Sequence, residues 1–193
     1  MSKAIAQTRA CVERAVIGLN LCPFAKAPQV KGQVRYAESQ ATTTEALLVD
    51  LLDELGRLAE APADRIETTL LVHPQVLGEF ADYNDFLDLA EGALAELGLE
   101  GVIQIASFHP QYQFAGSAPD DVDNNTNRSP WPTLHLIRED SIDRAVAAFP
   151  EADAIYEVNI ATMQKLGAEG WAALQQQCRD DAAAQSGDAT PLP

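Results

Sequence analysis

The chain has 193 residues, of which 47% are hydrophobic and 22% are charged, a composition typical of one globular domain and unlike that of disordered or collagen-like chains. Acidic residues outnumber basic ones 29 to 13 and give a formal net charge of -16, so phosphate backbones would repel the chain and we expect no nucleic-acid partner. No apolar run reaches the roughly 18 residues that span a bilayer, and the N-terminal residues lack a signal-peptide core. We therefore expect a cytoplasmic protein with no membrane partner.

Hydrophobic periodicity, runs of β-formers and turn residues divide the chain into alternating helices and strands. In chain order, we predict a helix ending near residues 18–20, a strand at 33–39, a helix opened by a Thr42–Glu45 capping box, a strand at 67–73, a helix at 80–97, a strand at 102–108, a polar loop at 111–132, a strand at 133–138, a helix capped by Ser141, a helix ended by Gly167 and a short last helix to Cys178. Residues 179–193 contain too few apolar side chains to anchor themselves. We expect one globular domain at 1–178 and a disordered acidic tail at 179–193.

This order of elements predicts an α/β (or α+β) fold with a single mixed four-stranded sheet covered by helices. Helices connect the first three strands, which favours parallel strands joined by crossovers. The last strand follows its neighbour through a loop without a helix, so we expect it to run antiparallel. The sheet should therefore be mostly parallel with one antiparallel strand.

The chain contains three histidines, and each lies at or near one end of a predicted strand. His73 and His109 follow two strands in His-Pro pairs, and His135 lies near the start of the last strand. In the expected topology these three positions share one edge of the sheet, where open α/β sheets bind ligands. We therefore predict that the three imidazoles line one pocket. The alternative is that each histidine caps backbone groups or packs on its neighbouring proline.

Three imidazoles with an open fourth position are typical of a catalytic zinc site, where bound water ionises near neutral pH. His73, His109 and His135 are therefore candidate ligands of a divalent metal such as zinc. Without a metal, one histidine could act as a general base and a second as an electrophile. The sequence favours neither reaction.

The polar loop at 111–132 is longer than compact domains usually keep without a function. Its Asp121-x-Asp123-x-Asn125 run begins like a calcium-binding EF-hand, but the later glycine and glutamate of that motif are missing. Hard-cation binding and a turn-rich solvated loop both stay open as interpretations.

Arg128 lies in this loop, and no acidic residue occurs between Asp123 and Glu139. An arginine can hold a carboxylate or a phosphate with two parallel hydrogen bonds. Arg128 is therefore our candidate for binding a small anionic molecule. The alternative is a surface arginine paired with the neighbouring aspartates.

The three cysteines are odd in number and far apart, which indicates reduced thiols rather than disulfides or a zinc ribbon. Cys22 is a candidate nucleophile because Lys26 is close in sequence. Cys22 nevertheless follows the end of a helix, where the helix dipole disfavours a thiolate, so a packed turn thiol is the preferred interpretation. Cys11 and Cys178 fall on predicted helix faces and are expected in the core.

Five segments carry a resemblance to a known family. They are Leu-Cys22-Pro-Phe-Ala-Lys, Leu-Val-His73-Pro, the segment around Phe-His109-Pro-Gln-Tyr, the segment from Asn127-Arg128 to His135 and Arg138, and Ile-Tyr156-Glu-Val-Asn159. Up to about Gly167, the chain resembles an uncharacterised bacterial family known as domain of unknown function 1415. This resemblance implies no catalytic residue, cofactor or partner.

Two classes of function stay open. The first is a small-molecule enzyme acting on an anionic substrate, with its site at His73, His109 and His135. In it Arg128 binds the anion, and Cys22 or the loop that carries Asp121 and Asp123 assists. The second is a non-catalytic ligand-binding or regulatory domain in which the histidines are structural. The two differ in geometry, because an enzyme needs imidazole nitrogens that face a pocket, whereas structural histidines are hydrogen-bonded to backbone.

Overall fold

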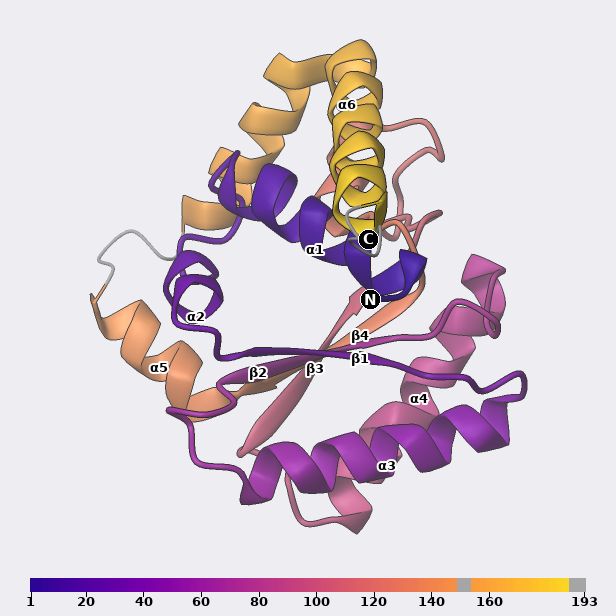
Figure 1. Cartoon of the computed structure of the whole chain (residues 1–193), viewed down its shortest axis with the longest axis vertical. Coiled ribbons are helices and arrows are strands. Elements are labelled where there is room, and N and C mark those ends of the chain that lie inside the picture. Colours follow the sequence, from indigo (N-terminus) through magenta and orange to yellow (C-terminus); the bar gives the residue numbers. More distant parts are fainter. Residues whose placement is uncertain (149–153, 188–193) are drawn as a thin grey trace, which may run out of the picture.

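A computed structural model of the chain describes residues 1–148 and 154–187. Helices lie on both sides of a central sheet (Figure 1). In chain order they are α1 (Lys3–Cys11), the π-helix η1 (Val12–Ile17), α2 (Lys26–Val30), α3 (Thr44–Glu60), α4 (Phe80–Glu96), the 3-10 helix η2 (Val122–Asn127), α5 (Glu139–Ala148) and α6 (Ile155–Gly187). Among these described helices, none is both long and apolar enough to cross a membrane.

Four strands form one sheet, β1 (Val34–Glu38), β2 (Thr68–Val72), β3 (Ile103–Phe108) and β4 (Thr133–Arg138), in the spatial order β1-β2-β4-β3. β1 and β2 pair in parallel, whereas β4 pairs antiparallel with both β2 and β3. The predicted α/β class and the mixed four-stranded sheet are confirmed. The prediction of a mostly parallel sheet is wrong, because β4 returns directly beside β3 and separates it from β2, so only one of the pairs is parallel.

The main core lies between one face of the sheet and helices α3 and α4, which Figure 1 shows together below the strands. Its larger buried side chains are Leu47, Leu51, Leu55, Leu58, Leu71, Tyr83, Phe86, Ile103, Leu134 and Leu136. The leucine periodicity of α3 is confirmed, although its cap is one residue later than predicted, since Thr43 Oγ1 accepts the Ala46 N–H at 3.3 Å. α5, by contrast, begins earlier than predicted, at Glu139 rather than after a cap at Ser141.

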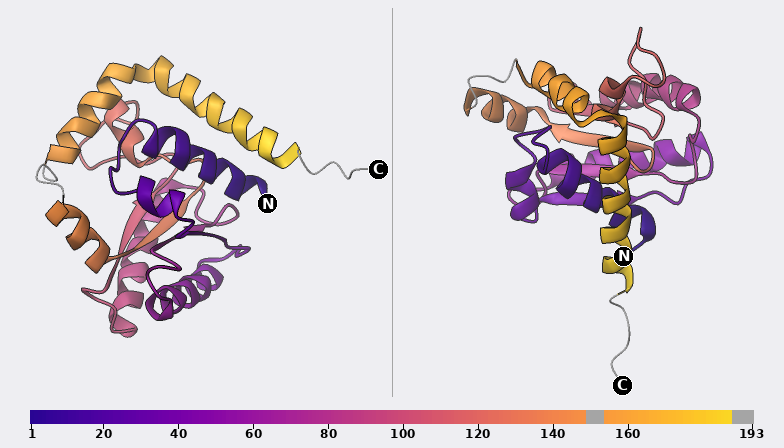
Figure 2. Two further views of the ribbon diagram at one scale, coloured as in Figure 1. Left: turned by 60° about the vertical axis from the view of Figure 1, so that its left-hand side comes forward. Right: turned by 90° about the horizontal axis from the view of Figure 1, so that it is seen from above.

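A second layer covers the other face, where α6 runs alongside α1 (Figure 2). The contact uses small side chains, because Ala6 and Ala10 of α1 pack against Cys178 and Ala182 of α6. The predicted helix break at Gly167 is confirmed, since this residue has a φ of 65° inside α6 and separates two helical segments. A positive φ suits glycine because it lacks a Cβ atom.

The tail predicted from residue 179 does not begin there. Residues 179–187 continue α6, and Ala182 is only 3% exposed against α1. Arg14 also forms an ion pair with Asp181. The sequence did not show this partner surface, because few side chains of the segment are apolar and α1 supplies the contact. Residues 188–193, the rest of the predicted tail, lie outside the described residues.

Candidate functional site

The register of the sheet separates the three predicted site histidines. Leu134 is buried in the main core and pairs with Leu71 of β2. Because successive side chains of a strand point to opposite faces, His135 lies on the face opposite Leu134. His73 and His109 instead follow β2 and β3 on the core side, where both rings contact helix α4. The predicted pocket of three histidines is therefore not formed.

His73 and His109 flank one tyrosine. The Tyr83 ring centroid lies 5.8 Å from that of His73 and 5.1 Å from that of His109. All three side chains are fully buried. The Tyr83 hydroxyl donates to the Thr133 carbonyl at 2.9 Å and accepts the Phe108 N–H at 3.1 Å, which fixes the ring at the ends of β3 and β4.

Both core histidines are held by backbone groups. His73 Nδ1 lies 3.1 Å from the Val76 carbonyl oxygen, to which it donates. His109 Nδ1 accepts the Gln111 N–H at 3.0 Å, so its Nε2 carries the proton and donates to the Leu77 carbonyl at 3.1 Å. Burial lowers the pKa of His73 to about 4 and also lowers the pKa of His109. Both rings are therefore neutral at neutral pH.

His135 has a structural role in the sheet. Its Nε2 lies 2.7 Å from Thr68 Oγ1, and that hydroxyl in turn donates to the Leu136 carbonyl at 2.7 Å. Because the hydroxyl proton is used on the carbonyl, the histidine must donate to the threonine. Burial lowers the pKa of His135 to about 4. These bonds tie β2 to β4. His135 therefore has a role in the sheet that does not involve the other two imidazoles.

No predicted metal centre is assembled within residues 1–148 and 154–187, since no group of three or more His, Cys, Asp or Glu side chains there could hold a metal ion. The candidate cation ligands of the loop have other partners. Asp121 Oδ2 accepts the Ala118 N–H at 2.7 Å, and Asp123 Oδ1 accepts from Gln164 Nε2 at 3.4 Å. This is the turn-rich interpretation of the loop, in which aspartates bond nearby backbone or side chains.

The Arg128 guanidinium donates its hydrogen bonds within its own loop and does not present a free pair of N–H groups to a ligand. Its guanidinium donates to the Tyr112 carbonyl at 3.2 Å, to Asn125 Oδ1 at 3.2 Å and to the Pro119 carbonyl at 2.7 Å. These acceptors are neutral, and in the described chain no carboxylate forms an ion pair with Arg128. The positive charge is therefore not cancelled locally, and the predicted pairing with loop aspartates is not found.

Cys22 lies in the turn after η1, where its carbonyl accepts the Ala25 N–H at 3.1 Å. Burial raises the pKa of its thiol, although hydrogen bonds from the Phe24 and Ala25 backbone partly oppose this effect. The thiol is thus predominantly protonated at neutral pH, which is the opposite of an activated nucleophile. Among the described residues, no contact joins Cys22 to the two core histidines or to Arg128.

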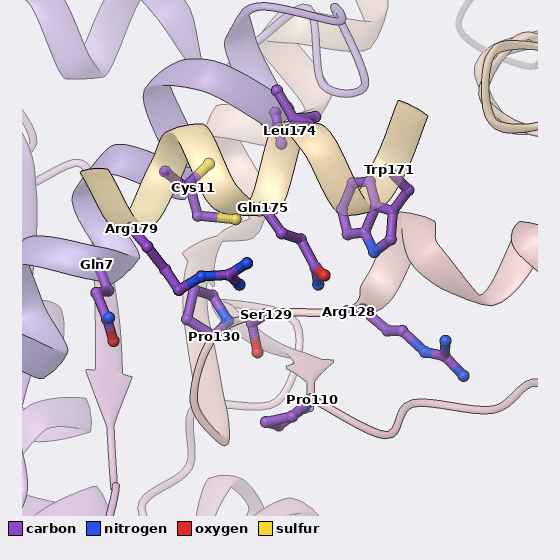
Figure 3. Close-up of a pocket in the computed structure, with 12 residues that line it drawn as sticks. Gln7, Cys11, Pro110, Arg128, Ser129, Pro130, Trp171, Leu174, Gln175 and Arg179 are labelled. Carbon is purple, nitrogen blue, oxygen red and sulfur yellow. The ribbon is translucent and has the colours of Figure 1, made fainter. Parts of the chain in front are cut away.

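The chain forms a pocket of about 180 Å³ elsewhere, between α1, α6 and residues 128–130 (Figure 3). Ala15, Trp171 and Leu174 make part of its wall apolar. Figure 3 shows Gln175 and Arg179 reaching from α6 toward the Ser129–Pro130 segment. We call this cavity the α1–α6 pocket.

Polar and cationic groups complete the α1–α6 pocket. Gln7, Ser129 and Gln175 contribute neutral polar side chains, while Arg128 and Arg179 contribute charge. None of the described residues that line it is acidic. A second, larger hollow of about 560 Å³ lies beside Arg128, but Glu79 and Asp120 line it. The electrostatics of the first pocket therefore suit an anion better than those of the second.

Two lining residues, Cys11 and Cys178, were expected only as core. Sequence reasoning missed their site because they lie far apart in the chain and follow no spaced motif. Arg179 was missed for a different reason, since it was assigned to a disordered tail. The available signal was the spaced alanines of α1, Ala4, Ala6 and Ala10, which give a helix face able to approach another helix closely.

The chain matches a family model described as "Protein of unknown function (DUF1415)" over residues 3–173. The match ends before Leu174, so the part of the α1–α6 pocket formed by Gln175, Cys178 and Arg179 lies beyond it. Neither the search of curated proteins nor that of solved structures finds a match.

Proposed function

The chain belongs to the DUF1415 family, whose description assigns no function, and from the geometry we propose that it binds a small anionic molecule in the α1–α6 pocket. The supporting observation is the charge of the lining. Arg128 and Arg179 are among the residues that line this pocket, and no acidic residue is among its described lining residues, in a chain of formal net charge -16. Such a concentration of positive charge makes the pocket the preferred place for an anion.

The dimensions and the lining of the pocket favour a small, partly apolar anion. The volume of about 180 Å³ is below the roughly 300–1,000 Å³ of pockets that enclose drug-sized ligands. Trp171 and Leu174 offer an apolar wall, and Arg179 offers donors for a carboxylate or phosphate. A short-chain carboxylate combines both features.

This proposal corresponds to the ligand-binding alternative and not to a histidine-centred enzyme. The three histidines donate to backbone or to Thr68, and none of them lines the described α1–α6 pocket. Arg128 keeps its predicted association with an anion, through its charge and by holding the loop that forms one wall.

We place this binding in the cytoplasm. The cysteines are free thiols in the structure, and reducing compartments maintain thiols in that state. Fractionation of cells that express the full chain tests this part of the proposal directly.

Titration with pentanoate tests the anion site, with pentanol as the neutral counterpart. Trp171 lines the pocket, so a Trp131→Phe background leaves it as the single fluorescent tryptophan. We expect pentanoate to change Trp171 emission saturably and pentanol to bind at least tenfold more weakly, because a charge-assisted hydrogen bond contributes about 1.5–3 kcal/mol. Equal affinity for both would contradict anion binding.

Arg179→Gln is the informative variant. Arg179 is exposed and hydrogen-bonds only Gln176 among the described side chains, so its loss leaves the fold intact. We expect the affinity for pentanoate to fall about tenfold, equivalent to about 1.4 kcal/mol. Lys165→Gln is the matched control, because it removes one exposed charge from the same helix outside the pocket. The same loss in both variants would indicate only a general charge effect.

A further inference from the structure

Two of the three cysteines lie against each other across the contact between α1 and α6. Cys178 is buried with Ala6, Ala10 and Ala182, and Cys11 packs against this group. The Cys11 and Cys178 thiols are close enough for each to shift the pKa of the other. The alanines let the two helices approach closely, and close approach of the two backbones is what a disulfide requires.

Both cysteines border a cavity, although Cys178 is only 5% exposed. Cys11 and Cys178 each line the α1–α6 pocket, and Figure 3 shows Cys11 there beside α6. A reagent of a few atoms can therefore reach the pair from solvent. Cys22, by contrast, is not among the residues that line this pocket.

The surroundings divide the two thiols into a nucleophile and a partner. Contact with the Cys11 thiol lowers the pKa of Cys178, and the charges of Arg14 and Arg179 lower it further, while burial and Asp181 oppose them. The same contact, together with burial, raises the pKa of Cys11 well above its usual value. Cys178 is therefore the thiol that ionises first, and Cys11 keeps its proton.

The backbone next to Cys11 also departs from regular structure. The π-helix η1 begins at Val12, and Gly18 N–H donates to the Glu13 carbonyl at 3.1 Å, a bond that spans five residues. A Cβ atom on Gly18 would overlap the carbonyl oxygen of Arg14, so this wide turn depends on glycine. π-helical turns are rare and occur frequently at functional sites.

We propose that Cys11 and Cys178 are a redox-active dithiol that reduces a small hydroperoxide and becomes a disulfide between α1 and α6. In the first step, the Cys178 thiolate attacks one oxygen of the peroxide. An S–O bond forms and the O–O bond breaks, so Cys178 becomes a sulfenic acid and the leaving oxygen takes a proton to give an alcohol, or water from hydrogen peroxide.

In the second step, Cys11 loses its proton and its sulfur attacks the sulfur of the sulfenic acid. An S–S bond forms, the S–O bond breaks, and the hydroxide takes up a proton and leaves as water. Two thiols have then supplied the two electrons that the peroxide accepts. A dithiol reductant restores both thiols by exchange through a mixed disulfide.

This activity goes beyond the proposed anion binding and does not depend on it. An anion is held by Arg179 and neighbouring polar groups, whereas the bonds of the redox steps form and break at the two sulfurs and the peroxide. Thiol mapping measures the redox activity and fluorescence titration measures anion binding, so failure of one proposal is distinguishable from failure of the other.

Peptide mapping of the full chain tests the dithiol. The reduced protein is treated with one equivalent of hydrogen peroxide, the remaining thiols are blocked with N-ethylmaleimide, and proteolytic peptides are analysed by mass spectrometry. We expect the three thiols to fall to one, with Cys22 blocked and a peptide pair joined through Cys11 and Cys178. Treatment with dithiothreitol should return all the thiols.

Single-cysteine variants separate the two steps. In Cys11→Ser, Cys178 should form a sulfenic acid that dimedone traps, with no cross-linked peptides. In Cys178→Ser, Cys11 should react with peroxide at least tenfold more slowly, because it keeps its proton and thiolate is the reactive form. Cys22→Ser is the matched control and should form the Cys11–Cys178 disulfide at the wild-type rate.

Three outcomes would overturn the proposal. One is oxidation of Cys22 as fast as that of Cys178. Another is the absence of cross-linked Cys11 and Cys178 peptides in the wild-type chain, a result that does not depend on any variant folding. The third is a Cys178 whose reaction with peroxide is no faster than that of free cysteine at the same pH.

Discussion

The Tyr83 ring stacks on the His73 imidazole, with 5.8 Å between the ring centroids and 13° between the planes. Tyr83 comes from α4, whereas His73 follows β2, so the contact fastens the helix to the end of the strand. The same tyrosine bonds backbone groups of Phe108 and Thr133. The tyrosine therefore packs against both His73 and His109, at the edge of the sheet where the sequence predicted a ligand pocket.

Tyr83→Phe should destabilise the fold. It keeps the ring stacking but leaves the Phe108 N–H and the Thr133 carbonyl without their hydroxyl partner in a buried place. We expect a loss of about 2 kcal/mol, within the usual penalty of about 1–3 kcal/mol for an unsatisfied buried group. Urea unfolding measures it, and Tyr156→Phe is the control because Tyr156 is 61% exposed. Equal stability of the two variants would show that the Tyr83 hydroxyl contributes nothing.

Acidification should weaken the protein through its buried histidines. The pKa of His73 is about 4 in the folded chain and 6.5 as its ordinary value, so the unfolded chain binds the proton more readily. The contribution of neutral His73 to the free energy of unfolding is complete above pH 6.5 and is lost as the pH falls toward 4. At about pH 5, His73 alone should cost about 2 kcal/mol of unfolding free energy relative to neutral pH.

The variant that isolates this effect is His73→Asn, since the asparagine amide can replace Nδ1 as donor to the Val76 carbonyl and does not titrate. Urea unfolding at several pH values should give a shallower dependence between pH 4 and 6.5 than the wild-type chain. His135, whose pKa is also about 4, should contribute separately. An unchanged pH dependence in His73→Asn would mean that His73 does not titrate on unfolding.

Cys22 should react slowly with iodoacetamide in the folded protein. Burial raises the pKa of its thiol, and the protonated form is a poor nucleophile. We expect alkylation of Cys22 to be several-fold slower than that of Cys178 and to accelerate when urea is added. Mass spectrometry of timed samples gives the rate for each cysteine. Rapid alkylation of folded Cys22 would restore it as a candidate nucleophile.

Ending the chain at Cys178 should lower its thermal stability. This truncation removes the buried Ala182 and the Arg14–Asp181 ion pair. The lost burial of Ala182 and its contacts with α1 alone costs about 1 kcal/mol, which corresponds to a fall of about 3 °C in Tm for a chain of this size. Calorimetry compares it with a chain ending at Gly187, which keeps both contacts. Identical melting of the two chains would show that residues 179–187 do not stabilise the fold.

Local patterns in the sequence determined most of the elements. The leucines of α3, the β-formers of β2 to β4 and the break at Gly167 are features of neighbouring residues, and the structure confirms them. Helical and strand periodicities depend on which residues are close in the chain, so they can be read without knowing the partners. The first predicted helix covers η1, but no local pattern indicated its π-helical form, and the short α2 was not predicted.

The tertiary structure alone decided the sheet order and the site. β4 pairs with β2 and β3 in a register that puts Leu134 in the main core and His135 on the other face of the sheet, and a shift of one residue would have exchanged the two faces. The meeting of Cys11 with Cys178 likewise depends on α6 folding back along α1 through alanines that carry little sequence signal. Contacts between distant segments are set by packing, which no local pattern specifies.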